Sequence, residues 1–354
     1  MTRLQTRMSQ EIAEAPAAVA RQAQGLAHPL RELVACLKRR PPQVVVTCAR
    51  GSSAHAATYG KHLIERTIGA PVAEAAPNIA SVYGRQLNLR NQLFLAISQS
   101  GKSDDLIAMA LSARAAGALT VAVLNVTDGP LARACDLILP IGAGPETSVA
   151  ASKTFVATLT ALQRLVAAWT DDAALARAVD ALPERLTEAT DLDWSAATGA
   201  LSRTRSLVTI GRGPTLAIAR EASLKLKETC NLHAEAFSGA EFLHGPVALA
   251  APTYPILMFM PTDAAAMGMR RLAADLRGKG TALFATEPAV GSSVRSSPAY
   301  EPIDGRLPAL PSDHPETDAV CLVQSLYAML PRLAERLGAD VDRPRHLQKV
   351  TRTR

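Results

Sequence analysis

Short apolar runs alternate along the chain with longer stretches of helical periodicity. Residues 44–47 are β-branched, lead into a Gly-Ser-Ser turn and are followed by a helical pattern at 55–65. Residues 207–210 lead in the same way into a Gly-Pro-Thr turn and a helical pattern at 216–230. Strands that alternate with helices of this length predict parallel sheets with right-handed crossovers. The predicted fold class is α/β, with two tandem doubly wound parallel-sheet domains, each a three-layer αβα sandwich.

The pattern is an internal repeat that keeps its spacing over most of the chain. Gly51 and Gly213 lie 162 positions apart. The apolar runs at 93–97 and 255–259, and those at 120–124 and 281–285, keep that spacing to within one residue. The long helical patterns that begin near Ser152 and His314 also keep it. We therefore expect two domains of the same topology.

The chain length agrees with two domains, because 354 residues exceed the size at which one hydrophobic core stops growing. The chain is divided as follows: an N-terminal helical segment 1–40, a first domain 41–170, a helical linker 171–204, a second domain 205–338 and a C-terminal tail 339–354. Residues 291–311 are rich in Gly, Pro, Ser and Arg, which predicts an exposed loop of the second domain.

Charge and cysteine content narrow the classes of partner. The net charge is +6, but the basic residues are scattered, which suits a small anionic ligand better than a nucleic acid. The basic end at 343–354 is short and has no Phe, Tyr or Trp. The five cysteines form no C-x-x-C pair, and no signal peptide or membrane span is evident. We expect a cytoplasmic protein with no nucleic-acid or membrane partner.

Two serine-rich turns are the first candidates for ligand binding. In open parallel sheets, ligands bind beyond the carboxyl ends of the strands, where the turns at 51–53 and 98–103 should meet. Backbone N–H groups at helix N-termini, together with hydroxyls, can hold a phosphate, although a single Ser there is usually only an N-cap. Two nucleotide-binding motifs are excluded. A Walker A loop would need a glycine where the chain has Ala96, and a dinucleotide-binding fingerprint would need a small residue where it has Leu216.

Charged residues in the second half supply candidates for chemistry. Glu221, Lys225 and Glu228 are spaced i, i+4 and i+7, which places them on one helix face. Taken alone, this face is most simply a solvated salt-bridge stripe. His233 and His244 lie in a polar segment, where each could instead be a hydrogen-bonded core histidine. No spacing typical of metal ligands occurs, so we expect neither a metal nor a cofactor.

Six blocks of the chain, in order from about residue 8 to the C-terminus, resemble one family. This family comprises the isomerase half of glucosamine-6-phosphate synthase and its relatives, which carry two sugar-isomerase (SIS) domains. The matching blocks are residues 98–101, 143–153, 221–228, 233–236, 241–246 and 342–349. The resemblance implies substrate binding by these residues: Gly51, Ser52, Ser53, Ser98, Gln99, Ser100, Ser103, Val149 and Ser152.

The resemblance also implies roles in catalysis. Glu228 looks like the base that moves a proton between C1 and C2 of the sugar, with Glu221 and Lys225 supporting it. His244 looks like the group that opens the sugar ring, reaching the site from the other subunit of a homodimer. Lys349 resembles the tail lysine that contacts the open-chain carbonyl.

Departures from the synthase pattern direct the prediction within the family. The chain enters the matching region soon after Met1, so we expect no domain that releases ammonia from glutamine. The turn Arg50-Gly-Ser-Ser and the residues after Lys349 look closer to SIS-type glucosamine-6-phosphate deaminases. The predicted activity is therefore conversion of glucosamine 6-phosphate to fructose 6-phosphate and ammonia. The alternatives are another amino-sugar or ketosamine 6-phosphate isomerase, deaminase or deglycase of the same fold, or a non-catalytic phosphosugar sensor.

Overall fold

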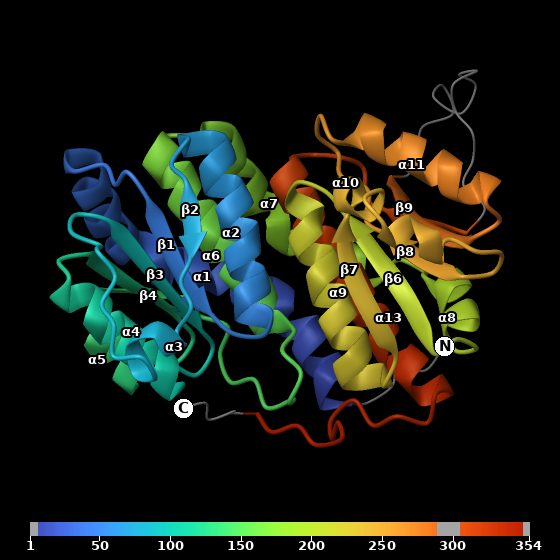
Figure 1. Ribbon diagram of the computed structural model, residues 1–354, viewed down its shortest axis with the longest axis horizontal. Coiled ribbons are helices and arrows are strands. Elements are labelled where there is room, and N and C mark those ends of the chain that lie inside the picture. The colour runs from blue at the N-terminus through green and yellow to red at the C-terminus, as the bar shows by residue number, and fades with distance from the viewer. Residues whose placement is uncertain (1–5, 289–304, 350–354) are drawn as a thin grey trace. The chain divides into compact units, whose positions relative to one another are not determined.

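The computed structural model describes residues 6–288 and 305–349. Internal contacts divide the chain into two compact units, each built on one sheet (Figure 1). We name them the N-terminal unit and the C-terminal unit, after the positions of their sheets along the chain. The N-terminal unit comprises residues 14–147, 153–180 and 348–354, and the C-terminal unit comprises residues 1–13, 148–152 and 181–347.

The N-terminal unit contains a five-stranded, all-parallel sheet of order β2-β1-β3-β4-β5. Its strands are β1 Val45–Ala49, β2 Val72–Glu74, β3 Leu93–Ser98, β4 Leu119–Leu124 and β5 Leu137–Pro140. Every residue of β1 and β3 is buried, which explains why these strands read as continuous apolar runs rather than as alternating patterns.

Helices cover both faces of this sheet. They are α2 Ser52–Ile68, α3 Asn78–Ser81, α4 Asp104–Ala115, α5 Pro130–Ala134 and α6 Lys153–Thr170, while α1 Arg7–Arg39 and α7 Ala173–Thr190 contribute residues to both units. On one face, Phe94 packs with Leu106 and Met109 of α4 in a buried apolar cluster. In the other layer, Tyr59 of α2 is fully buried and its hydroxyl accepts a hydrogen bond from Gln163 Nε2 of α6 at 2.7 Å.

The C-terminal unit repeats this architecture with sheet order β10-β9-β8-β6-β7, again all parallel. Its strands are β6 Ser206–Gly211, β7 His233–Ser238, β8 Pro255–Met258, β9 Ala282–Pro288 and β10 Arg306–Ala309. Its helices are α8 Ser195–Leu201, α9 Pro214–Cys230, α10 Gly239–Phe242, α11 Ala266–Gly278 and α13 Pro315–Arg336, with a 3₁₀ turn at Pro246–Leu249. The predicted α/β fold with two tandem parallel-sheet domains is confirmed.

The helices that follow the first strand of each repeat agree in detail. Both α2 and α9 are 17 residues long and follow a glycine of unusual backbone, Gly51 at φ 54°, ψ −134° and Gly213 at φ 60°, ψ −131°. Both end on a residue in the left-handed conformation, Gly69 and Asn231. The repeat spacing therefore extends to individual backbone conformations.

One predicted loop contains a strand. Residues 306–309, placed in the expected loop 291–311, form β10, which pairs in parallel with β9 at the edge of the sheet. Leu307 and Ala309 are buried while Arg306 and Pro308 are less so, which is a strand alternation. Pro308 hid it from the sequence pattern, since proline is tolerated in strands mainly at sheet edges. The remainder of that prediction, residues 289–304, lies outside the described residues.

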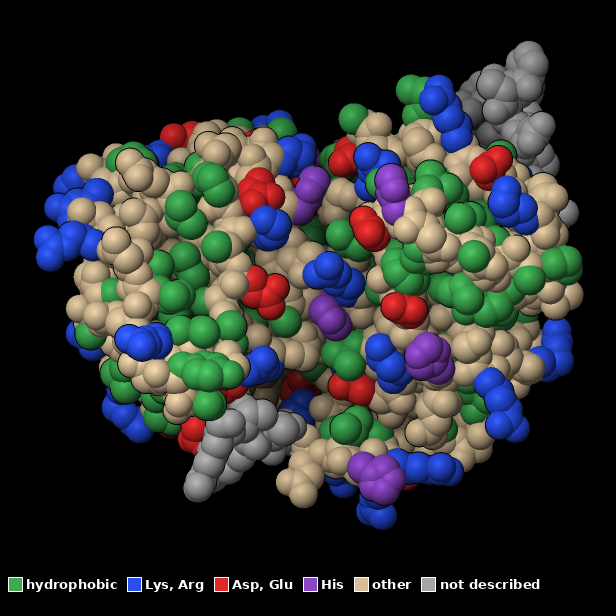
Figure 2. All heavy atoms as spheres, viewed as in Figure 1, with side chains coloured by type: hydrophobic (Ala, Val, Ile, Leu, Met, Phe, Trp, Pro, Cys, Tyr) green, Lys and Arg blue, Asp and Glu red, His purple; other side chains and the backbone are tan. Residues whose placement is uncertain are grey.

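The distribution of charge on the surface and the apolar content of the helices are relevant to nucleic-acid and membrane partners. On the face seen in Figure 2, Lys and Arg side chains are interspersed with Asp and Glu over each unit rather than gathered into one basic patch. Among the helices that the structure describes, none is both long and apolar enough to cross a membrane.

Candidate active site

The two serine turns meet at one edge of the N-terminal sheet. Strands β1 and β3 are parallel neighbours, with Ala49 paired to Ile97, so the turns that follow them leave the sheet side by side. The first turn opens α2 and the second precedes α4. Ser98 is buried, Gly51 is exposed, and the other predicted binding residues of these turns are half-buried: Ser52, Ser53, Gln99, Ser100 and Ser103. The structure thus brings together seven of the nine residues to which sequence analysis assigned substrate binding.

Ordinary helix capping does not explain these serines. The N-cap of α2 is Gly51, and the N-cap of α4 is Ser103, whose side chain makes no capping hydrogen bond. Ser98 Oγ instead accepts a hydrogen bond from the backbone N–H of Gly101 at 3.1 Å, which shapes the second turn. Two helix N-termini and several hydroxyls at one sheet edge form a suitable site for an anion.

An ion pair that sequence analysis missed links the two turns. Arg50, directly before the first turn, donates from Nε at 3.1 Å and from Nη2 at 2.6 Å to Asp105 Oδ2, in the first turn of α4. The Asp105 side chain is 2% exposed, whereas that of Arg50 is 51% exposed. An acidic residue in the first turn of a helix is common, so the sequence held no signal for this pairing.

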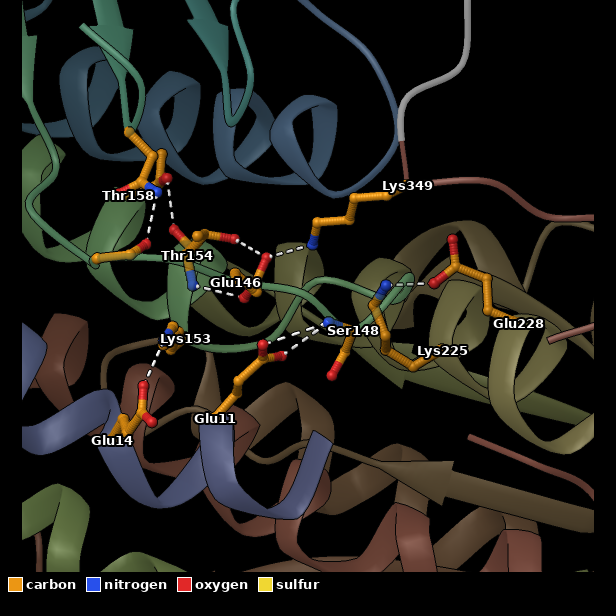
Figure 3. Close-up of polar contacts among 12 residues, drawn as sticks. Glu11, Glu14, Glu146, Ser148, Lys153, Thr154, Thr158, Lys225, Glu228 and Lys349 are labelled. Carbon is orange, nitrogen blue, oxygen red and sulfur yellow. Dashed lines mark hydrogen bonds and ion pairs between the residues drawn. The ribbon is translucent and has the colours of Figure 1, made fainter. Parts of the chain in front are cut away.

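Glu146 is a second buried carboxylate of the N-terminal unit, and it holds the predicted tail lysine (Figure 3). Its Oε1 accepts from the backbone N–H of Thr154 at 3.1 Å, and its Oε2 accepts from Thr154 Oγ1 at 2.7 Å. Lys349 Nζ donates to Glu146 Oε2 at 2.9 Å. Glu146 lies within a block that matched the family, but no role was predicted for it.

The segment between Glu146 and α6 carries the two remaining predicted binding residues. Val149 is half-buried and Ser152 is fully buried, and both belong to the C-terminal unit. In the same unit, the backbone N–H of Ser148 donates to both carboxylate oxygens of Glu11 at 3.2 Å (Figure 3). The α1 helix therefore fixes the position of this segment through a charged hydrogen bond.

The predicted base lies in a buried charged cluster of the C-terminal unit. Lys225 and Glu221 are fully buried, and Glu228 is 21% exposed. Lys225 Nζ forms an ion pair with Glu228 Oε2 and lies 3.6 Å from Glu221 Oε1, while Tyr327 Oη donates to Glu221 Oε1 at 2.9 Å. The interpretation of this face as a solvated salt-bridge stripe is wrong, because α13 packs over it through Tyr327.

The two histidines are exposed, so neither is a core histidine. His233 lies on β7, and His244 follows α10, where its backbone N–H donates to Glu241 O at 2.9 Å. Within the described part of the C-terminal unit, no hydrogen bond or ion pair joins His244 to Glu228. The described residues also contain no cluster of three or more His, Cys, Asp or Glu that could hold a metal ion.

Comparisons with known proteins identify the family of the chain. A family model of the SIS domain matches residues 40–168 and 200–283. The chain is 32% identical over 322 residues to the glutamine–fructose-6-phosphate aminotransferase [isomerizing] of Caulobacter vibrioides, a match that covers 86% of this chain and 51% of that protein. The chain thus spans about half the length of the curated relatives that it matches.

Solved structures show the same fold over nearly the whole chain. A candidate phosphosugar isomerase from Silicibacter pomeroyi DSS-3 superposes with a TM-score of 0.87 at 42% identity, covering 95% of this chain and all of that one (100%). The C-terminal domain of glucosamine-fructose-6-phosphate aminotransferase from Francisella tularensis superposes with a TM-score of 0.85 at 24% identity, covering 96% and 99%.

Proposed function

Because this chain belongs to the SIS domain family, we propose that it is an enzyme that converts glucosamine 6-phosphate to fructose 6-phosphate and ammonia. The resemblance inferred from the sequence blocks is confirmed at the level of the family. The observation that supports catalysis is the Lys225–Glu228 ion pair, in which a buried ammonium group contacts a partly exposed carboxylate.

A carboxylate in this setting suits proton transfer between neighbouring carbons. Lys225 forms an ion pair with Glu228 and also lies beside Glu221, which accepts a hydrogen bond from Tyr327. Isomerisation of an aldose requires one base that takes a proton from one carbon and returns it to the next. Glu228 can perform both steps because the buried Lys225 fixes its side chain, which nevertheless remains accessible to a ligand.

The proposed reaction proceeds in three stages. His244 assists ring opening, which yields the C1 aldehyde with its amino group at C2. Glu228 removes the C2 proton and delivers it to C1, while O1 gains one proton and the amino nitrogen loses one, so that the aldehyde and amine become a C1 alcohol and a C2 imine. Water then adds to the imine carbon, and ammonia leaves as the C2 ketone of fructose 6-phosphate forms.

The remaining predicted residues have binding roles in this proposal. The serine turns at 51–53 and 98–103 would hold the phosphate through backbone N–H groups and hydroxyls, with Val149 and Ser152 as further substrate contacts. Lys349 would lie near the open-chain carbonyl. The turn Arg50-Gly-Ser-Ser and the tail after Lys349, which look closer to the deaminases of the family, support deamination rather than isomerisation alone.

The test is to incubate the purified protein with glucosamine 6-phosphate and to measure ammonia and fructose 6-phosphate together. Equal amounts of both products are expected. A ketose product without ammonia would contradict deamination and indicate a simple isomerase. Binding without either product would contradict catalysis and favour a phosphosugar sensor.

We also propose that the protein is a homodimer in which His244 acts in the active site of the partner subunit. The exposure of His244 and the match of its block to the family support this assignment. Mixing inactive Glu228→Gln and His244→Ala proteins should restore part of the activity through hybrid dimers. No restoration, despite demonstrated subunit exchange, would assign His244 to the site of its own subunit.

A further inference from the structure

Glu146 connects three parts of the N-terminal unit: the segment after β5, the start of α6 and the C-terminal tail. It lies in the segment after β5, contacts the first turn of α6 through Thr154, and contacts the C-terminal tail through Lys349, 203 positions away (Figure 3). Its side chain is completely buried, whereas that of Lys349 is 25% exposed. The tail lysine therefore extends from the surface to a carboxylate in the interior.

The buried carboxylate of Glu146 needs its hydrogen-bond donors to offset the free-energy cost of burial. An ionised carboxylate without partners in a protein interior is costly, so burial must be offset by hydrogen bonds and positive charge. Thr154 supplies two hydrogen bonds at the N-terminus of α6, where the helix dipole also favours negative charge. Lys349 supplies the ammonium group. The same contact that satisfies Glu146 fixes Lys349 Nζ at one place.

We propose that Glu146 is a positioning residue, which holds the Lys349 ammonium group at the open-chain carbonyl of the substrate during turnover. The inference rests on the proposed function, because it assigns Lys349 a role in that reaction. Glu146 itself does not contact the reacting atoms. It selects one of the many positions that a flexible four-carbon side chain on a terminal tail could otherwise adopt.

The choice of substitution separates positioning from simple structural support. Glu146→Gln keeps the size of the side chain and an oxygen that can accept from Thr154, but it removes the charge that attracts Lys349. Glu146→Asp keeps the charge but shortens the reach. If Glu146 positions Lys349, the Asp variant should retain more activity than the Gln variant, and both should fold.

A double-mutant cycle measures whether Glu146 acts through Lys349. Glu146→Gln in the wild-type background should lower kcat about 10- to 100-fold, with little change in KM, since a misplaced catalytic group slows chemistry more than binding. In a Lys349→Met background, the same Glu146→Gln change should have almost no further effect. Lys38→Met, which breaks the exposed ion pair with Asp171 in the same unit, serves as the control and should retain wild-type kcat.

Equal losses from Glu146→Gln in both backgrounds would overturn the proposal, because they would show that Glu146 does not act through Lys349. Hydrogen exchange of residues 343–349 adds a measurement that needs no activity, and Glu146→Gln should make this exchange faster. If the wild-type protein turns over no hexosamine 6-phosphate, the proposed function fails, but the exchange still tests the anchor. Unchanged exchange in the Gln variant would overturn the anchor itself.

Discussion

Helices α2 and α9 occupy the same position in the two repeats and have the same length, yet they bury different residues. At the positions where α2 buries Tyr59 and Leu63, α9 buries Glu221 and Lys225. Each helix receives a hydrogen bond from the helix packed against it, Gln163 of α6 in one unit and Tyr327 of α13 in the other. The N-terminal unit shows that apolar and neutral residues satisfy this position of the fold.

This difference indicates where the chain has given up stability for another purpose. A buried ion pair is often no more stabilising than apolar residues of similar size, because desolvation offsets the attraction between the charges. The fold does not need Lys225 and Glu221, since its own first copy has neither. Their presence beside the partly exposed Glu228 is best explained by the chemistry proposed for that carboxylate.

In the turns before these helices, it is the N-terminal unit that has the more polar and more accessible residues. The first turn has Ser52 and Ser53, both half-buried, where the second has Pro214, which lacks an N–H, and Thr215, which is buried. Thr215 Oγ1 accepts from the backbone N–H of Arg212 at 3.0 Å and donates to Phe259 O at 2.8 Å. The second turn is thus closed by internal hydrogen bonds, while the first remains accessible. Under the proposed function, one copy keeps the anion site and the other keeps the base.

The largest effect should come from Glu228→Gln. Loss of the base should lower kcat about 10³-fold, within the range attributed to a positioned general base, while phosphosugar binding remains. Activity is measured by ammonia release and binding by calorimetry. Lys227→Gln, at the exposed neighbouring position, is the matched control and should retain activity. A Glu228→Gln protein with more than a tenth of wild-type kcat would remove Glu228 from the mechanism.

The next largest effect concerns the stability of the charged cluster. Lys225→Met leaves Glu221 buried without its ammonium partner and should lower the free energy of unfolding by about 3–5 kcal/mol. Adding Glu221→Gln should recover part of this loss, because the buried charge is then removed as well. Urea denaturation followed by circular dichroism measures both. A double variant that is less stable than Lys225→Met alone would contradict the inference, drawn from Tyr59 and Leu63, that the fold does not need the charges of Glu221 and Lys225.

Copying the second turn into the first tests which copy binds phosphate. Ser52→Pro should preserve the helix, because proline is tolerated at the first helical position, but it removes an N–H and a hydroxyl. Hydrogen bonds to a charged group contribute about 1.5–3 kcal/mol, so KM should rise about 10- to 100-fold. The reciprocal Pro214→Ser should leave KM unchanged. Similar KM values for wild type and Ser52→Pro would place the phosphate elsewhere.

The smallest effect should come from the pair that links the turns. Arg50→Met removes a half-exposed cation and leaves the Asp105 carboxylate without its ion-pair partner beside the proposed phosphate site. KM should therefore rise several-fold, and the rise should shrink at high salt, since exposed charges are screened. Arg114→Met is the matched control, because Arg114 is 50% exposed and pairs with Asp136 in the same unit. An equal effect of both substitutions would show that net charge alone is responsible.

The sequence alone determined the architecture and the candidates for chemistry. Burial on both sheet faces makes strands such as β3 continuous apolar runs, and helical periodicity marks α2 and α9, so both copies of the fold could be predicted from local patterns. The residue blocks pointed to Glu228 and to the serine turns. The short edge strand β10 was missed because Pro308 interrupts its pattern.

Only the tertiary structure decided which charged residues are buried and what holds them. The spacing of Glu221, Lys225 and Glu228 is the same for a surface stripe as for a buried cluster, and Tyr327, 106 positions from Glu221, makes the difference. The pairs Arg50–Asp105 and Glu146–Lys349 likewise join residues 55 and 203 positions apart. Periodicity reports only which face of an element is apolar, whereas the partner of a charge depends on how distant segments pack.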